Sequence, residues 1–274
     1  IQWLQLHSKF KIPVYLGGSH KENVNICKKL EPCQDSTTPV ESLYCEHEEA
    51  DDRLLYHINH AIKVENYDRV IVASTDTDVF VCLVHHFNRW IYLGLNEIWM
   101  IGGQGHTKRY FAIHDIVEAI PQELSDVLPA VHSLTGCDTT SKISTKYTTI
   151  NTVSKEYYHL LTEFGRSEMN DRINHNAEEY LVHCLNKSAN CVDFNDLRYT
   201  MYHQKNFQMD VIKLPCTSCS IQFHILRSYL QCFHWLHAPF QNRILLHLIE
   251  FGYDFNAEEY LVPIIVSPDN ILPA

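Results

Sequence analysis

The chain has 274 residues, 45% of them hydrophobic, which is enough to bury one large core or one domain with a small appendage. Its formal net charge of -11 excludes a basic surface over the whole molecule, so any nucleic-acid contact must come from local groups of Lys and Arg. Apolar runs are far shorter than the roughly 20 residues that cross a bilayer, and no signal pattern is visible, so we expect an intracellular protein of the nucleus or cytoplasm with no membrane partner.

The first predicted elements point to an α/β fold. A short strand is expected at Ile12–Leu16, followed by a polar, Pro-containing loop from Cys27 to Val40. Glu46–Arg53 opens a helix, because apolar residues then recur with a period of 3.6. Val70–Ala73 is apolar throughout, which predicts a central strand of a parallel sheet that is covered on both faces. A helix followed by such a strand is typical of α/β proteins.

The middle of the chain starts with the acidic segment Ser74–Asp78. A short helix or helical turn is predicted at Val79–Val84, and strands are predicted at Trp90–Leu93 and Glu97–Met100. The glycine-rich segment Gly102–Gly105 matches neither the Walker nor the dinucleotide pattern. We therefore interpret it as a plain turn and expect no nucleotide cofactor.

The second half of the chain is predicted to be mainly helical. Helices are expected at Ile113–Ile120, from Pro121 to Leu134, within Tyr147–Cys184 and at Phe223–Leu236, and a short strand with an extended end follows Tyr260. Leu214-Pro215 and the polar residues around it suggest a boundary. The segment Asn176–Val182 recurs letter for letter as Asn256–Val262, but the flanking residues differ, so we predict no structural repeat.

Three groups of acidic residues are the main candidates for chemistry. Glu48, Glu49, Asp51 and Asp52 lie at a helix start, Asp76 and Asp78 follow the predicted buried strand, and Asp138 follows another helix. The carboxyl ends of parallel strands are where sites form in α/β sheets. Carboxylates that converge there repel one another unless a cation neutralises them. Oxygen ligands suit Mg²⁺ or Mn²⁺, and two such ions about 3.5–4 Å apart are used to cleave phosphodiesters.

Each group also has an ordinary structural explanation. Acidic residues such as Glu49 and Asp51 are favoured in the first turn of any helix by its dipole. Asp76 and Asp78 could end a strand through side-chain turns, and Asp138 could cap the next helix. The order of all three groups, rather than any one of them, favours a metal site.

That order resembles the PIN-like, flap-endonuclease (XPG-type) 5′-nuclease superfamily. The matching parts are Glu49-Ala50-Asp51 at a helix start, Asp76-Thr77-Asp78 after a strand, and Leu134-Thr135-Gly136-Cys137-Asp138. The chain is most similar to the uncharacterised, mobile-element-associated PIN-like proteins of animal genomes. Their pattern reads H-x-E-A-D-T-R, then S-P-D-T-D-V, then L-P-A-x-H-A-L-T-G-C-D-T-T-S, and the likeness covers most of the chain.

The resemblance implies an α/β, three-layer PIN-like fold with a central, mainly parallel sheet over residues 1–205, and a C-terminal helical appendage over 206–274. It implies a divalent-metal-dependent nuclease that acts on DNA or RNA, with a preference for ends or branched structures. The implied catalytic and metal-binding residues are Glu49, Asp51, Asp76, Asp78 and Asp138, with Glu48 as a spare candidate and two Mg²⁺ or Mn²⁺ ions as cofactors. Nothing in the sequence indicates the oligomeric state.

The chain also departs from the superfamily. Its members use further aspartates from an N-terminal strand, whereas Asp35 is the only aspartate before Glu46; because the sequence starts with Ile1, we expect a fragment. Ser141–Lys146 replaces a glycine-rich hairpin that grips DNA, although Lys142 and Lys146 could still contact phosphate. The alternative function is therefore a degenerate, mobile-element-derived domain that acts as a binding or scaffold protein.

A zinc-dependent interaction module is a weaker alternative. Cys216-x-x-Cys219 has the spacing of a zinc half-site, and His224, Cys232, His234 and His237 follow it. The second half-site lacks the usual partner spacing. We expect most of the ten cysteines to be reduced, small apolar side chains.

Overall fold

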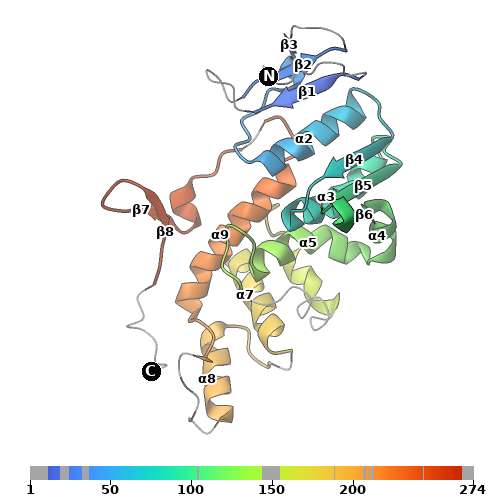
Figure 1. Cartoon of the computed structure of the whole chain (residues 1–274). Helices are drawn as coiled ribbons and strands as arrows, with labels where there is room; N and C mark the ends of the chain where they lie inside the picture. The colour runs from blue at the N-terminus through green and yellow to red at the C-terminus, as the bar shows by residue number, and fades with distance from the viewer. Residues whose placement is uncertain are drawn as a thin grey trace. The chain divides into compact units, whose positions relative to one another are not determined.

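The computed structural model describes residues 12–18, 25–32, 37–103, 105–143, 155–187, 189–205, 208, 210, 213–242 and 244–266. It is a mixed α/β structure, as the sequence predicts at that coarse level (Figure 1). The chain forms two compact units. The first comprises Ile1–Val79, His86–His114 and His237–Ile244, and the second comprises Phe80–His85, Asp115–Leu236 and Leu245–Ala274. The division into 1–205 and 206–274 stays a prediction. No helix among the described residues is both long and apolar enough to cross a membrane.

The first unit begins with a small antiparallel sheet in the order β1-β2-β3. Its strands are β1 (Val14–Gly17), β2 (Cys27–Leu30) and β3 (Thr37–Pro39), and the 3₁₀ helix η1 (Glu41–Leu43) follows. The strand expected near Ile12–Leu16 is confirmed, but the loop expected from Cys27 to Val40 is wrong. In β2 only the two end residues are buried, with Lys28 and Lys29 between them. So short a pattern does not stand out in the sequence, because the strand depends on pairing with both neighbours.

A second sheet in the same unit has the order β4-β5-β6. The predicted helix α2 (Ala50–Lys63) is confirmed and leads into β4 (Arg69–Ala73), which pairs in parallel with β5 (Glu97–Gly102). Strand β6 (Arg109–Ala112) then pairs antiparallel with β5, after the 3₁₀ turn η2 (Gly105–Thr107). In Figure 1, α2 and β4 run in opposite directions, so that α2 starts on the side where β4 ends.

The position of β4 in this sheet corrects one expectation. Within the described residues β4 pairs only with β5 and lies at the edge of the sheet, not at its centre. Val72 is buried, whereas Ile71 on the other face is 62% exposed. From the apolar run we expected both faces of β4 to be covered by other elements. In the part of the chain that is described, only the face with Val72 is packed.

Helix α3 (Thr77–Ile91) is longer than the helix expected at Val79–Val84, and it replaces the strand predicted at Trp90–Leu93. Trp90 is fully buried in the last helical turn, in line with the buried Leu83 and Phe87. The chain then turns, with the N–H groups of Leu93 and Leu95 donating to the Trp90 carbonyl oxygen. The aromatic residues that suggested a strand are explained by this helical spacing of buried side chains.

The second unit consists mainly of helices, and the predicted helices near 113–120, 121–134 and 223–236 are confirmed. Its elements are α4 (Ile113–Ala119), α5 (Gln122–Thr135), η3 (Lys155–Leu161), α7 (Asp171–Leu185), α8 (Phe194–Gln204), α9 (Ser218–His237), η5 (Leu248–Phe251), β7 (Tyr253–Phe255) and β8 (Leu261–Pro263). Strands β7 and β8 form an antiparallel hairpin, which confirms the short strand after Tyr260. Of the helices expected within 147–184, the described residues contain η3 and α7, and 147–154 lie outside them.

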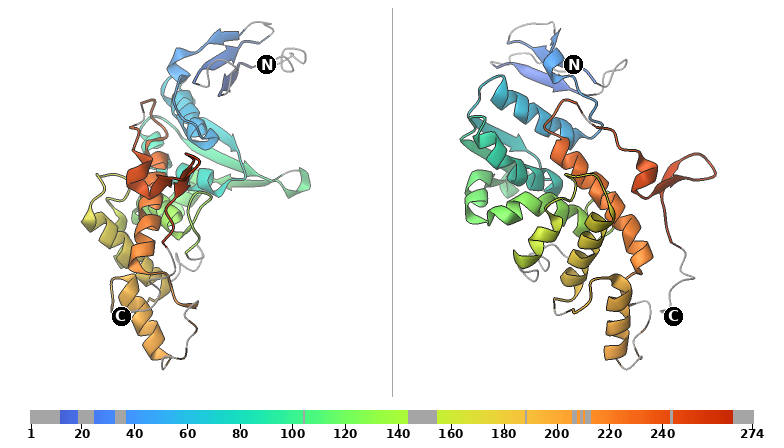
Figure 2. Two further views of the ribbon diagram at one scale, coloured as in Figure 1. Left: turned by 90° about the vertical axis from the view of Figure 1, so that its left-hand side faces the viewer. Right: turned by 180° about the vertical axis from the view of Figure 1, so that it is seen from behind.

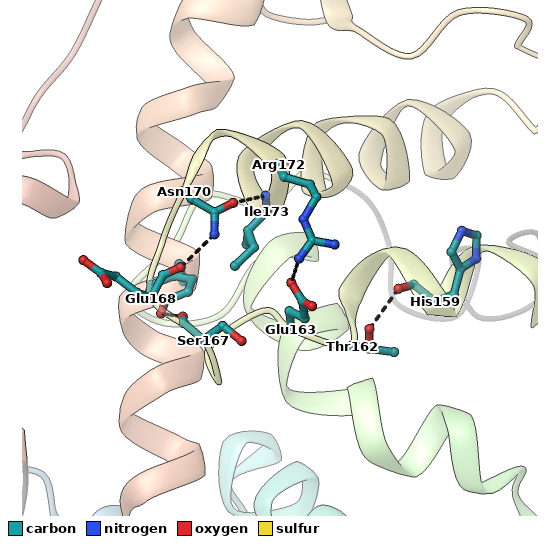
Figure 3. Close-up of polar contacts among 9 residues, drawn as sticks. His159, Thr162, Glu163, Ser167, Glu168, Asn170, Arg172 and Ile173 are labelled. Atoms are coloured by element: carbon teal, nitrogen blue, oxygen red, sulfur yellow. Dashed lines mark hydrogen bonds and ion pairs between the residues drawn. The ribbon is translucent and has the colours of Figure 1, made fainter.

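The start of α7 is fixed by polar contacts with the segment after η3 (Figure 3). The Asn170 side-chain oxygen accepts from the backbone N–H of Ile173 at 3.1 Å, which satisfies a donor that has no partner within the helix. The Asn170 amide group donates to the Glu168 carbonyl oxygen at 3.1 Å. Two residues after Asn170, Arg172 forms an ion pair with Glu163. These contacts set the direction in which α7 leaves the loop.

Candidate metal centre

Asp76 and Asp78 lie where β4 ends and α3 begins. Asp76 is the N-cap of α3, and its Oδ1 atom accepts from the backbone N–H of Asp78 at 2.8 Å. The Asp76 N–H donates to Ser74 Oγ at 3.1 Å. Both carboxylates are half-buried. Asp76 therefore has a structural task in the helix cap, which uses one of its two oxygens.

The other acidic group of this unit lies at the start of α2. Glu49 is the N-cap residue and is exposed, and its side chain makes no capping hydrogen bond. Asp51 is half-buried in the first turn. Asp52, which belongs to the same acidic group but is not among the implied ligands, is only 2% exposed. The sequence places Asp52 in the acidic start of a helix, but helical periodicity alone does not show that its side chain is buried.

The direction of α2 relates these two groups. A helix of 14 residues is about 21 Å long, and a strand of five residues is about 16 Å long. Because α2 runs back against the direction of β4, its start and the end of β4 lie on the same side of the unit (Figure 1). The start of α2 and the end of β4 are thus at one end of this unit, where the parallel strands β4 and β5 have their carboxyl ends.

Asp138 belongs to the second unit and lies in a tight loop after α5. Gly136 ends the helix with φ 120°, and a Cβ atom there would lie 2.6 Å from Lys142 Cα. Thr140 Oγ1 donates to the Ser133 carbonyl oxygen at 2.7 Å, which closes the loop. Asp138 is exposed on this loop. It does not cap a described helix, contrary to one of the ordinary explanations.

The remaining predicted residues are placed as follows. Glu48 and Lys142 are exposed, and Lys146 lies outside the described residues. Of the rival zinc residues, Cys219 is exposed, whereas Cys232 is buried. Burial raises the pKa of the Cys216 thiol to about 11, so it keeps its proton at neutral pH and is not a ready thiolate ligand. His224 Nε2 is bonded to the Leu134 carbonyl oxygen at 2.8 Å.

The donor chemistry of the candidate residues fits a hard cation, because all five are carboxylates. Within the described ranges, however, no group of three or more His, Cys, Asp or Glu side chains is arranged to hold a metal ion. The assignment of Glu49, Asp51, Asp76, Asp78 and Asp138 as ligands stays a prediction.

Comparisons of the chain with protein-family models, with curated proteins and with solved structures found no match.

Proposed function

We propose that the chain is a divalent-metal-dependent nuclease that hydrolyses phosphodiester bonds of DNA or RNA. The observation that supports this most is the position of Asp76 and Asp78 at the carboxyl end of β4, which is paired in parallel with β5. This is the edge at which α/β sheets form their sites. We further propose that β4 and β5 belong to the sheet of a three-layer, PIN-like fold, in keeping with the resemblance of the sequence motifs.

The proposed roles of the residues follow from their positions. Asp76 uses Oδ1 in the cap, so its Oδ2 atom is the oxygen available as a ligand. Asp51 and Asp78 each lie in the first turn of a helix, at the positive end of the helix dipole. A bound Mg²⁺ or Mn²⁺ pair would supply an activated water and stabilise the leaving oxygen. Asp138 is the fifth proposed ligand on the basis of the sequence motif alone.

A second candidate is a catalytically degenerate domain that binds a partner or acts as a scaffold. The specific observation in its favour is the structural role of Asp76. Because the carboxylate caps α3, selection for stability alone would be enough to keep an acceptor at this position. The same binding surfaces could then persist without hydrolysis.

The test is cleavage of labelled flap, hairpin and single-stranded oligonucleotides in Mg²⁺ or Mn²⁺. We expect the wild-type protein to cleave at least one substrate, and Asp76→Asn and Asp51→Asn to be slower by at least about 100-fold, since a bound metal contributes several kcal/mol to such reactions. Asp68→Asn is the matched control, because Asp68 is an exposed carboxylate next to the opposite end of β4. Equal cleavage by wild-type protein and Asp76→Asn would contradict the nuclease, and no cleavage by any form would favour the scaffold.

A further inference from the structure

The turn between β5 and β6 is a glycine-rich arm of the first unit. Figure 2 (left) shows β5 and β6 extending as two strands away from the rest of this unit. Gly103 has φ 77°, and a Cβ atom there would lie 2.4 Å from the Thr107 carbonyl oxygen, so the turn closes only with glycine at this position. The described turn residues from Gly105 to Lys108 are exposed. A turn is present at the predicted position.

The arm has a positive charge in an acidic chain. Residues 98–114 contain no Asp or Glu, whereas Lys108 and Arg109 follow one another and His106 lies nearby. Lys108 and Arg109 are exposed, and within the described part of the chain neither forms an ion pair with a carboxylate. The arm is the turn between β5 and β6, and His106, Lys108 and Arg109 are its basic residues. Cations without a carboxylate partner, in a protein with a net charge of -11, are complementary to a polyanion.

An exposed aromatic residue follows these cations in the chain. Tyr110 in β6 is 62% exposed, and its cross-strand partner is Ile101 of β5. Because side chains alternate along a strand, Tyr110 lies on the same sheet face as Ile101 and Ile71, the face left uncovered by the described residues. By the same alternation, the Arg109 side chain lies on the opposite face of β6, and Lys108 lies in the turn before it. Exposed aromatic rings are where unpaired bases stack, while cations along the same edge contact the phosphates.

The arm also starts beside the candidate metal centre. The Ser74 N–H donates to the Ile101 carbonyl oxygen at 3.2 Å. A Cβ atom at Gly102 would lie 3.6 Å from the Ser74 carbonyl oxygen. Because β4 and β5 are parallel, the arm leaves the sheet at the edge where Asp76 follows β4. A strand held by the arm would therefore lie next to the carboxylates.

We propose that the arm binds single-stranded nucleic acid, with Lys108 and Arg109 on phosphates of the strand and Tyr110 stacked on an unpaired base. Delivery of the strand to Asp76 rests on the proposed nuclease function, whereas binding by the arm does not. A Cβ atom at Gly105 would meet nothing within 4 Å, so the side of the turn at Gly105 is open and its backbone can be approached closely. A duplex, with its bases already stacked, would lose the Tyr110 contact.

The experiment is fluorescence anisotropy with labelled oligo(dT) and oligo(U) at several salt concentrations, with EDTA present so that no cleavage occurs. In the double variant Lys108→Ala/Arg109→Ala, we expect weaker binding. The slope of log K against log salt concentration should decrease in magnitude by about 1.4, since each phosphate contact on a single strand contributes about 0.7 to it. Tyr110→Ala should weaken binding by about fivefold to 100-fold without changing that slope. Comparing the two oligonucleotides distinguishes DNA from RNA.

Two matched controls lie elsewhere on the same unit. Lys63 at the end of α2 and Tyr67 just before β4 are both exposed, so Lys63→Ala and Tyr67→Ala should leave affinity and slope unchanged. Circular dichroism checks that each variant folds.

The outcomes separate this inference from the nuclease. The role of the arm would be overturned by an unchanged slope in the double variant or by equal affinity for single-stranded and duplex oligonucleotides. It would also be overturned if the protein bound vesicles of anionic lipid in preference to the oligonucleotides. If Asp76→Asn still binds through the arm but no form of the protein cleaves, the arm is supported and the nuclease is not. If cleavage depends on Asp76 while the arm variants bind normally, the nuclease is supported and the arm is not.

Discussion

Asp76 is expected to serve both as a helix cap and as a metal ligand, and two substitutions separate these roles. Asp76→Ala removes the acceptor for the Asp78 N–H at 2.8 Å, which costs about 1 kcal/mol. Asp76→Asn keeps an oxygen that can accept the same hydrogen bond and loses only the interaction of the charge with the helix dipole, about 0.3–1 kcal/mol. For a chain of this size, 1 kcal/mol corresponds to a shift in Tm of about 2–4 °C.

Thermal unfolding followed by circular dichroism, together with the cleavage assay, measures both effects. We expect Asp76→Ala to unfold at a lower temperature than Asp76→Asn, whereas both lose cleavage to the same extent. Full cleavage by Asp76→Asn with loss only in Asp76→Ala would refute the reasoning, because the side chain would then act through the cap alone. Equal Tm values for the two variants would show that the observed cap contributes little.

Three further predictions concern other parts of the molecule. Burial lowers the pKa of His85 from its ordinary 6.5 to about 4. Between these two pH values the unfolded chain binds a proton that the folded chain does not, so the free energy of unfolding should rise by up to about 3 kcal/mol from pH 4 to 6.5. His85→Gln should flatten this part of the pH profile, measured by chemical denaturation. Glu178 is buried, and its carboxylate accepts hydrogen bonds from Phe194 N and Ser218 Oγ. Glu178→Ala should therefore lower the free energy of unfolding by about 2–4 kcal/mol. The same change at the exposed Glu258 should cost under about 0.5 kcal/mol. Gly136→Ala should lower Tm, because its Cβ atom would clash with Lys142 and φ is positive; an unchanged Tm would contradict the loop geometry.

The repeated heptapeptide shows a limit of prediction from local sequence. The first copy, Asn176–Val182, lies inside α7, whereas the second copy, Asn256–Val262, forms the turn of the β7–β8 hairpin and the first two residues of β8. In the second copy, Asn256 Oδ1 accepts from Glu258 N and Tyr260 N. The absence of a structural repeat is confirmed, and the reason is physical. Identical residues adopt the conformation that their neighbours allow them to pack, because tertiary contacts outweigh intrinsic helix propensity.

Long periodic elements were predicted well, and short or context-dependent ones were not. The helices α2, α5 and α9 followed from apolar periodicity and from boundaries such as Gly136. Strands β2 and β3 were missed because they are only four and three residues long and depend on each other. The exposed face of β4 was missed because an apolar run does not show how many faces are packed.

The candidate site could be predicted as a set of residues but not as an arrangement. The motifs selected Asp76 and Asp78, and the structure places them at a strand end as expected. The sequence did not reveal that Asp52 is buried. It also did not draw attention to Lys108 and Arg109, because two cations are not a strong basic run. The role proposed for them rests on the acid-free segment around them and on their position after the turn that follows β5.

The central claim is that the acidic edge of the first unit binds divalent metal, and titration with Mn²⁺ followed by electron paramagnetic resonance tests it most directly. The account predicts that wild-type protein and the Asp68→Asn control remove free Mn²⁺ from solution equally, while Asp76→Asn binds at least about tenfold more weakly, since a lost charged ligand costs more than 1.4 kcal/mol. Wild-type protein that leaves the free Mn²⁺ signal unchanged, or Asp76→Asn that binds as tightly as wild type, would contradict it.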